Sequence, residues 1–156
     1  MKAMLAITLF FTLYLSAFGR IGETREQCIE RYGKPDSSPS VPSVLSFEKS
    51  GLEIYVLFND AGNADFIAFG KLPDSKGSCD SLSKSEIDVL MESNGEEWIE
   101  NTPTNPKNSR EWQTEDKKRF ANLDEFGITL TIKTADCVKR LEENAKEKAR
   151  KQLQGF

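Results

Sequence analysis

The order of the predicted elements constrains the fold most, because the same order occurs twice along the chain. Each half has a capped helix, a proline-containing loop and three strand-like segments. Alternation of apolar and polar residues in such segments is typical of strands that bury one face of a sheet. The sequence therefore predicts an α+β fold, a module over residues 20–133 in which two helix-plus-three-stranded antiparallel sheet halves (22–70 and 82–133) pack as one domain.

A capping box opens the helix of the first half. Thr24 is an N-cap residue with Gln27 three positions later, which satisfies two free backbone amides. Gly33 and Pro35 end this helix. After a Ser/Pro-rich loop, we expect strands over residues 44–49, 52–58 and 66–69.

The second half repeats these signals. Ser83 and Glu86 form another capping box, and Leu82 and Ile87 occupy the positions of a hydrophobic staple. Asn94-Gly95 ends the helix. The sequence then predicts three strands over residues 110–114, 118–123 and 128–133.

The apolar positions of these elements predict one core, with the sheet buried on one face by the helices and at least partly exposed on the other. On the sheet side we expect Leu52, Ile54, Val56, Phe58, Ile128, Leu130 and Ile132. On the helix side we expect Ile29, Tyr32, Ile87, Leu90 and Met91.

A charged C-terminal helix is predicted over residues 134–156. Thr134 or Asp136 can cap it, and a narrow apolar seam that is mostly alanine after Leu141 follows one side. Residues 139–151 carry a net charge of +3. We expect this helix to dock at its start and to project into solvent at its end.

The first 19 residues have the layout of a secretory signal peptide. Lys2 gives a basic start, residues 3–18 carry no charge, and Ala17 and Gly19 place small residues before a cut. The alternative is an uncleaved membrane anchor, although the run is short for a full span. We expect cleavage after Gly19, an exported protein that is periplasmic or secreted, and no stable membrane insertion after cleavage.

Composition excludes several kinds of chemistry. The chain has no histidine, so histidine triads and histidine-ligated metals are excluded, and three cysteines are too few for a four-cysteine zinc site. The net charge is −4, and −5 once Lys2 is removed with the signal peptide. An acidic protein is a poor partner for nucleic acid. We assign no catalytic, cofactor-binding or metal-binding residues and expect no cofactor.

Two tryptophans and a set of carboxylates are the residues with a possible function. Trp98 and Trp112 are candidate binding aromatics, with core packing as the favoured alternative. Glu96, Glu97 and Glu100 surround Trp98, and a pair of carboxylates can hydrolyse a glycoside. A solvated helix end is the favoured interpretation of this acidic run.

The cysteines allow one disulfide if the protein is exported, because the compartment is then oxidising. Cys28 lies on the apolar face of the first helix, which suits a buried free thiol. Cys79 lies in a polar loop and Cys137 in the first turn of the last helix. We therefore predict the pair Cys79–Cys137.

Four segments resemble a set of small exported bacterial proteins that brings no known activity. They are G-E-T-x-E-x-C-x-x-R-Y-G-x-P (22–35), L-S-x-x-E-I-x-x-L (82–90), W-Q-T-E-D (112–116) and the C-terminal tail. Remotely, a capped helix followed by an antiparallel sheet resembles the small lipoprotein of the outer-membrane barrel-assembly complex. Tandem copies of that unit resemble the β-lactamase-inhibitory proteins. Both resemblances imply a helix-plus-sheet unit in each half.

These observations favour a non-catalytic exported module that binds another envelope or extracellular protein through an exposed sheet face. A protein interface needs roughly 800 Å² per partner, which such a sheet can provide. A carboxylate-based hydrolase of cell-wall or polysaccharide substrates is the alternative, and a membrane-tethered structural protein is a third hypothesis. A deep pocket with two carboxylates would support the hydrolase.

Overall fold

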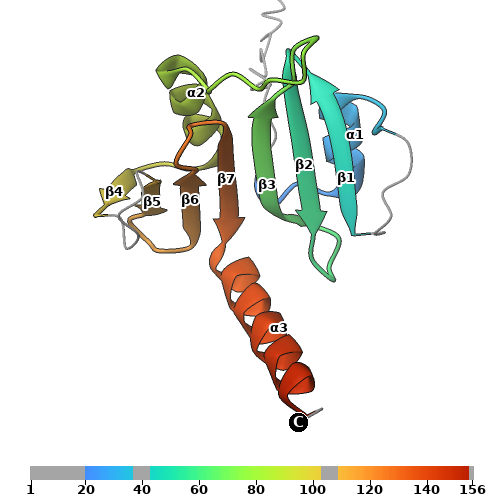
Figure 1. Cartoon of the computed structure of the whole chain (residues 1–156), viewed down its shortest axis with the longest axis vertical. Coiled ribbons are helices and arrows are strands. Elements are labelled where there is room, and N and C mark those ends of the chain that lie inside the picture. Colours follow the sequence, from blue (N-terminus) through green and yellow to red (C-terminus); the bar gives the residue numbers. More distant parts are fainter. Residues whose placement is uncertain (1–19, 37–42, 103–108, 155–156) are drawn as a thin grey trace, which may run out of the picture.

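A single antiparallel sheet of seven strands organises the structure (Figure 1), which is a computed structural model that describes residues 20–36, 43–102 and 109–154. The strand order is β1-β2-β3-β7-β6-β5-β4. The strands are β1 (Val44–Lys49), β2 (Leu52–Phe58), β3 (Ala64–Lys71), β4 (Trp98–Asn101), β5 (Arg110–Thr114), β6 (Arg119–Leu123) and β7 (Thr129–Thr134). The helices are α1 (Arg25–Tyr32), α2 (Lys84–Asn94) and α3 (Ala135–Leu153). The predicted α+β class is confirmed.

The two halves meet in the middle of this sheet. Each half is a meander that ends in a central strand, β3 in the first and β7 in the second. These two strands pair antiparallel, with Ile67 opposite Ile132 and Phe69 opposite Leu130. All four side chains are fully buried. The halves therefore share one continuous sheet and one core.

Most strand predictions are confirmed, and one strand is missing from them. The segments predicted at 44–49, 52–58 and 110–114 match β1, β2 and β5, and the other three match to within two residues at each end. The second half, however, has four strands, because Trp98–Asn101 forms β4 against β5. The expectation of a solvated helix end around Trp98 is therefore wrong, since α2 already ends at Asn94.

Both predicted capping boxes are present. The Thr24 hydroxyl accepts from the backbone N–H of Gln27, and the Ser83 hydroxyl accepts from that of Glu86. In each case the side chain at the third helical position also accepts from the N-cap backbone. The capped helices lie on the same face of the sheet, with the Tyr32 ring 5.0 Å from that of Phe47 and Leu90 fully buried. This covered face holds the core.

The core contains most of the expected residues, with two exceptions. Ile29 is 38% exposed, because Cys28 and Tyr32, four positions apart, occupy the inward side of α1 and Ile29 is turned away from it. Ile128 precedes β7 and is half-buried in the turn. The core also holds aromatic and aliphatic side chains absent from the predicted list, chiefly Phe47, Ile67, Phe69, Trp112 and Leu123.

Helix α3 begins at one end of the sheet, which we call the base. At the base β2 turns into β3, β5 turns into β6, and β7 leads into α3. The Thr134 hydroxyl caps α3, as predicted. A shift of register leaves Asp65 without a partner on β2, as in a β-bulge, and its buried carboxylate accepts two hydrogen bonds of 2.5 and 3.0 Å from Arg140. This pair fixes the first turns of α3 to β3.

The predicted disulfide does not form, and all three cysteines are free thiols. Cys79 is exposed in the loop after β3, and this loop lies opposite the base, where the N–H of Leu82 donates to the carbonyl of Gly127. Cys137 is buried at the base. Strand β7 separates the two ends, and its five residue steps span roughly 17 Å at about 3.4 Å each. A disulfide needs Cα atoms within about 7 Å of each other.

Two features bear on the membrane hypotheses. The predicted signal peptide, residues 1–19, lies outside the described residues. Within the described part of the chain, no helix has the length and the apolar character needed to cross a bilayer.

We predict a sharp change in amide hydrogen exchange along α3. Slow exchange is expected from Cys137 to Leu141, where the helix is fixed to the sheet, and fast exchange after about Ala145, because residues 141–154 are all exposed. Exchange measured residue by residue by NMR would check this. Uniform protection as far as Leu153 would contradict it.

Candidate protein-binding surface

The face of the sheet opposite α1 and α2 is the strongest candidate for a functional surface, and we call it the open face. Residues directly opposite each other in paired strands point to the same side, so the register defines this face. Of the described helices, α1 and α2 pack on the covered face, while the start of α3 borders the open one through Val138. The open face comprises Val44, Ser46, Glu48, Glu53, Tyr55, Leu57, Phe66, Ala68, Gly70, Ile99, Asn101, Glu111, Gln113, Phe120, Asn122, Thr129, Thr131 and Lys133.

Large side chains form a row across the open face. The register places Leu57 opposite Phe66, Phe66 opposite Lys133, and Lys133 opposite Phe120. These four side chains are half-buried, and Ile99 extends the row on β4 with 48% of its surface exposed. Aromatic and aliphatic groups kept accessible on a regular surface are the usual anchors of protein interfaces.

Tyr55 lies next to this row, two residues before Leu57 on the same face of β2. It is 43% exposed, and its hydroxyl donates a hydrogen bond of 2.5 Å to the Glu53 carboxylate. That hydrogen bond raises the pKa of Tyr55, so its hydroxyl remains protonated under physiological conditions. A phenol held in place by a neighbour offers a large contact surface at a low cost in entropy.

A hollow in the open face is too small to enclose a metabolite. It has a volume of about 210 Å³ and lies between β4, β5, β6 and the start of α3, where Phe120, Lys133 and Val138 line it. Small-molecule sites commonly measure about 300–1,000 Å³ and surround most of the ligand. The shape of the open face therefore suits a side chain or a backbone segment of another protein.

The two tryptophans that the sequence singled out lie together, but on the covered face. The Trp98 indole N–H donates to the carbonyl of Met91 at 2.9 Å, and a Cβ added to Gly95 would lie 2.8 Å from the Trp98 ring. Trp112 is buried, and the Arg110 guanidinium lies 4.6 Å from the centre of its ring. Both rings border a groove of about 280 Å³ beside α2. Their contacts are those of packing residues.

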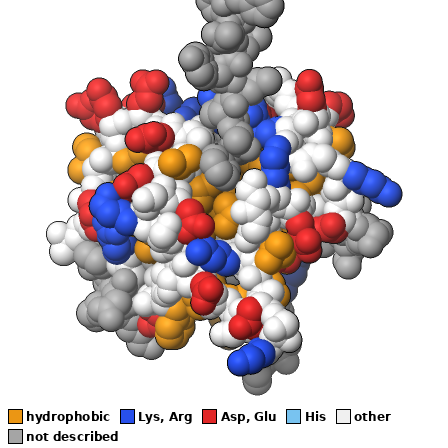
Figure 2. Space-filling model, turned by 90° about the horizontal axis from the view of Figure 1, so that it is seen from above, with side chains coloured by type: hydrophobic (Ala, Val, Ile, Leu, Met, Phe, Trp, Pro, Cys, Tyr) orange, Lys and Arg blue, Asp and Glu red, His pale blue; other side chains and the backbone are white. Residues whose placement is uncertain are grey.

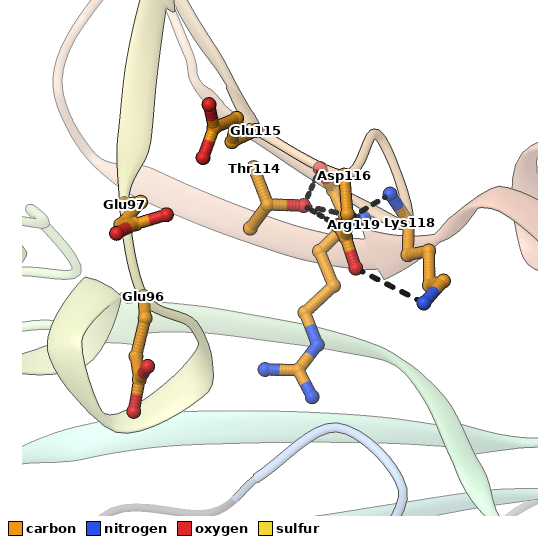
Figure 3. A pocket seen from close by; sticks show the side chains of 7 residues that line it. All are labelled: Glu96, Glu97, Thr114, Glu115, Asp116, Lys118 and Arg119. Atoms are coloured by element: carbon orange, nitrogen blue, oxygen red, sulfur yellow. Dashed lines mark hydrogen bonds and ion pairs between the residues drawn. The ribbon is translucent and has the colours of Figure 1, made fainter.

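The acidic run around Trp98 is divided by the structure. Glu100 forms a two-pronged ion pair with Arg110, with distances of 2.8 and 3.0 Å, and this pair lowers the pKa of Glu100. Glu96 and Glu97 instead border a pocket of about 490 Å³ at the base, which we call the base pocket (Figure 3). Its other lining residues are Thr114, Glu115, Asp116, Lys118 and Arg119.

Hydrogen bonds in the base pocket keep one carboxylate ionised. Asp116 accepts from the Thr114 hydroxyl at 2.7 Å and from the Lys118 backbone N–H at 3.0 Å, which lowers its pKa to about 2. A glycoside hydrolase needs one carboxyl group with a raised pKa as its general acid. The four described carboxyl groups with a clear pKa shift, Glu26, Glu86, Glu100 and Asp116, are all shifted downward. The lowered pKa of Asp116 makes this residue unsuited to the role of general acid.

The described residues, and the side drawn in Figure 2, bear on two further kinds of site, one for a metal and one for nucleic acid. Within residues 20–36, 43–102 and 109–154, no three acidic or cysteine side chains are grouped as metal ligands. Figure 2 shows Lys and Arg side chains interspersed with Asp and Glu on the side that it presents. Nucleic-acid binding proteins gather their basic residues in one patch or stripe.

Comparisons with known proteins add one weak similarity. No family model matches the sequence, and no curated protein matches it. Among solved structures, the crystal structure of a DUF4309 family protein from Bacillus subtilis is similar with a TM-score of 0.41 and 9% sequence identity. The match covers 72% of this chain and 78% of that one. A similarity at this level assigns neither a family nor a function.

We predict that Thr114→Val raises the pKa of Asp116 from about 2 toward its usual 3.8, because the strongest of its hydrogen bonds is lost. The lowered pKa of the folded state stabilises the fold at a pH above the unfolded value, and this contribution is lost as the pH falls through about 2. An NMR titration of the Asp116 carboxyl carbon measures the shift. Thr131→Val on the open face is the matched control, and a titration that Thr114→Val leaves unchanged would contradict the assignment.

Proposed function

We propose that the protein is a non-catalytic exported module that binds another envelope or extracellular protein through its open face. The observation that supports this proposal is a row of partly exposed, mostly apolar side chains that crosses the open face near the base, with α1 and α2 both on the opposite side. A sheet face of this kind requires no rearrangement before binding, which limits the entropy lost on association.

The composition of the open face favours a protein as its partner. Its apolar members Leu57, Phe66 and Phe120 lie among polar and charged ones, with Glu53 and Glu111 toward the sides and Lys133 in the row. Interfaces of proteins that also exist alone have this mixture, in which aromatic groups contribute most of the affinity and charged groups select the partner. The hollow beside Phe120 can receive one side chain of that partner.

The export predicted from the sequence is consistent with the same proposal. The charge-free run of residues 3–18 and the small residues before position 20 have the layout of a cleaved signal peptide. The partner is then a protein of the cell envelope or the surrounding medium.

We predict that substitution of the open face weakens partner binding. The double variant Tyr55→Arg/Phe120→Arg introduces one charge into the row, at Phe120, and one beside it, at Tyr55, which should weaken a stoichiometric complex at least about tenfold. Retention of the partner by the tagged, exported protein from envelope extract measures this effect. Thermal unfolding confirms that the variant is folded, and Tyr55→Ala offers a milder change.

The matched control for this experiment is Val89→Arg. Val89 is 42% exposed on α2, close to the 43% of Tyr55, but it belongs to the opposite side of the molecule. A partner that the control retains and the open-face variants lose supports the proposal. A partner that all variants retain equally would refute it.

We also predict that the isolated protein begins at Arg20. Its intact mass should equal that of residues 20–156, because signal peptidase cuts after a small residue. A mass that still includes residues 1–19 would instead support the membrane-tethered hypothesis.

A further inference from the structure

The outer part of α3 packs against no other element of the described chain. Every residue from Leu141 to Gln154 is exposed, with Leu141 exposed to 40% and Leu153 to 71%. The helix has 19 residues and is about 28 Å long at 1.5 Å per residue, and its fixed contacts are those of its first turns. In Figure 1 it projects away from the base of the sheet.

This projecting helix carries cations that lack partners. Lys151 pairs with Glu147 at 2.7 Å. Lys146, Lys148 and Arg150 form no ion pair with any described residue. Residues 139–151 have a net charge of +3, whereas the rest of the chain from Arg20 onward has −8. The exposed end of α3 is therefore a basic segment on an acidic molecule.

The base pocket, in contrast, is lined by more acidic than basic side chains. Glu96, Glu97 and Glu115 on its rim have no cationic partner among the described residues, and Asp116 remains ionised. One of its two cations, Arg119, donates to the carbonyl of Asn94 at 2.6 Å, and the other, Lys118, pairs with Asp116. Figure 3 shows the side chains of Glu96 and Glu97 on the side of the pocket away from Lys118.

The base pocket and α3 lie at the same end of the sheet. Arg119 of the pocket is directly opposite Thr134, the N-cap of α3, and the N–H of Ala135 donates to the carbonyl of Lys118. When two copies meet base to base about a two-fold axis, each α3 can run past the axis toward the base of the other copy. Both α3 helices then bind at the same time, and the result is a closed dimer.

We propose that two copies of the chain form a dimer in which the basic end of α3 from each copy binds the base pocket of the other. The binding partner is a second copy because the basic end of α3 and the acidic base pocket lie at the same end of one molecule. A two-fold axis can then bring each α3 to the base pocket of the other copy. Exposed ion pairs contribute only about 0.2–1 kcal/mol each, so the dimer is weak and depends on salt.

Charge reversal tests the proposal on protein isolated from cells that express the full chain. The α3 variant carries Lys146→Glu, Lys148→Glu and Arg150→Glu. The pocket variant carries Glu96→Lys, Glu97→Lys and Glu115→Lys. Sedimentation velocity at low ionic strength should show a concentration-dependent dimer for the original chain. Its dissociation constant should rise at least about tenfold in each variant and on addition of 0.5 M salt.

A mixture of the two variants is the decisive measurement. The acidic α3 of the α3 variant can then bind the basic pocket of the pocket variant, and the basic α3 of the pocket variant can bind the acidic pocket of the α3 variant. A mixed dimer should therefore form, although neither variant associates alone. A chain that stays monomeric at low ionic strength would overturn the proposal, as would a mixture no more associated than its components. Binding of monomers to anionic vesicles without dimers would assign α3 to a lipid surface instead. Loss of dimers with open-face binding intact would leave the proposed function unaffected.

Discussion

The pairing of β3 with β7 is the interaction on which the rest of the structure depends. Ile67, Phe69, Leu130 and Ile132 are fully buried along this seam, and each such side chain stabilises the fold by about 1.5–3 kcal/mol. Without the pairing, the chain would form two small meanders, each with two free edges, a size that is marginally stable in water. With it, β1 and β4 are the edges of one sheet.

This central pairing also decides where the surfaces lie. Because β3 and β7 are antiparallel, the two halves are related by a rotation about an axis through the sheet, and each places its helix on the same side. One face therefore carries both α1 and α2, and on the other face the start of α3 is the part of the described helices that borders the sheet. The same arrangement directs β7 to the base, where α3 starts beside the end of β6.

Local signals in the sequence predicted the elements well. The capping boxes at Thr24 and Ser83 and the alternation around Ile54 gave the helix starts and the strands to within two residues. Strand β4 escaped prediction because its four residues include a single unbroken apolar pair, Trp98-Ile99, next to charged residues. The Cys79–Cys137 pair was wrongly predicted because the distance between them depends on the strand order, which no local pattern reveals.

The candidate surface was predictable in kind but not in its residues. Tyr55 alternates with Ile54 and Val56, so the period of two already places it on the opposite face from the core. Nothing in the sequence, however, states that both helices cover the same face. Trp98 and Trp112 were candidate binding aromatics with core packing as the favoured alternative, and the pairing of β4 with β5 turns both toward α2.

The central claim is that the open face contacts another protein in the living cell, and site-specific photo-crosslinking tests it most directly. A photoreactive phenylalanine analogue replaces Tyr55 on the open face, or Val89 on α2 at nearly the same exposure, and cells that export the protein are irradiated. The structure predicts a discrete crosslinked species of higher mass, containing a second protein, from position 55 and none from position 89. Crosslinks of equal yield from both positions, or from position 89 alone, would contradict it.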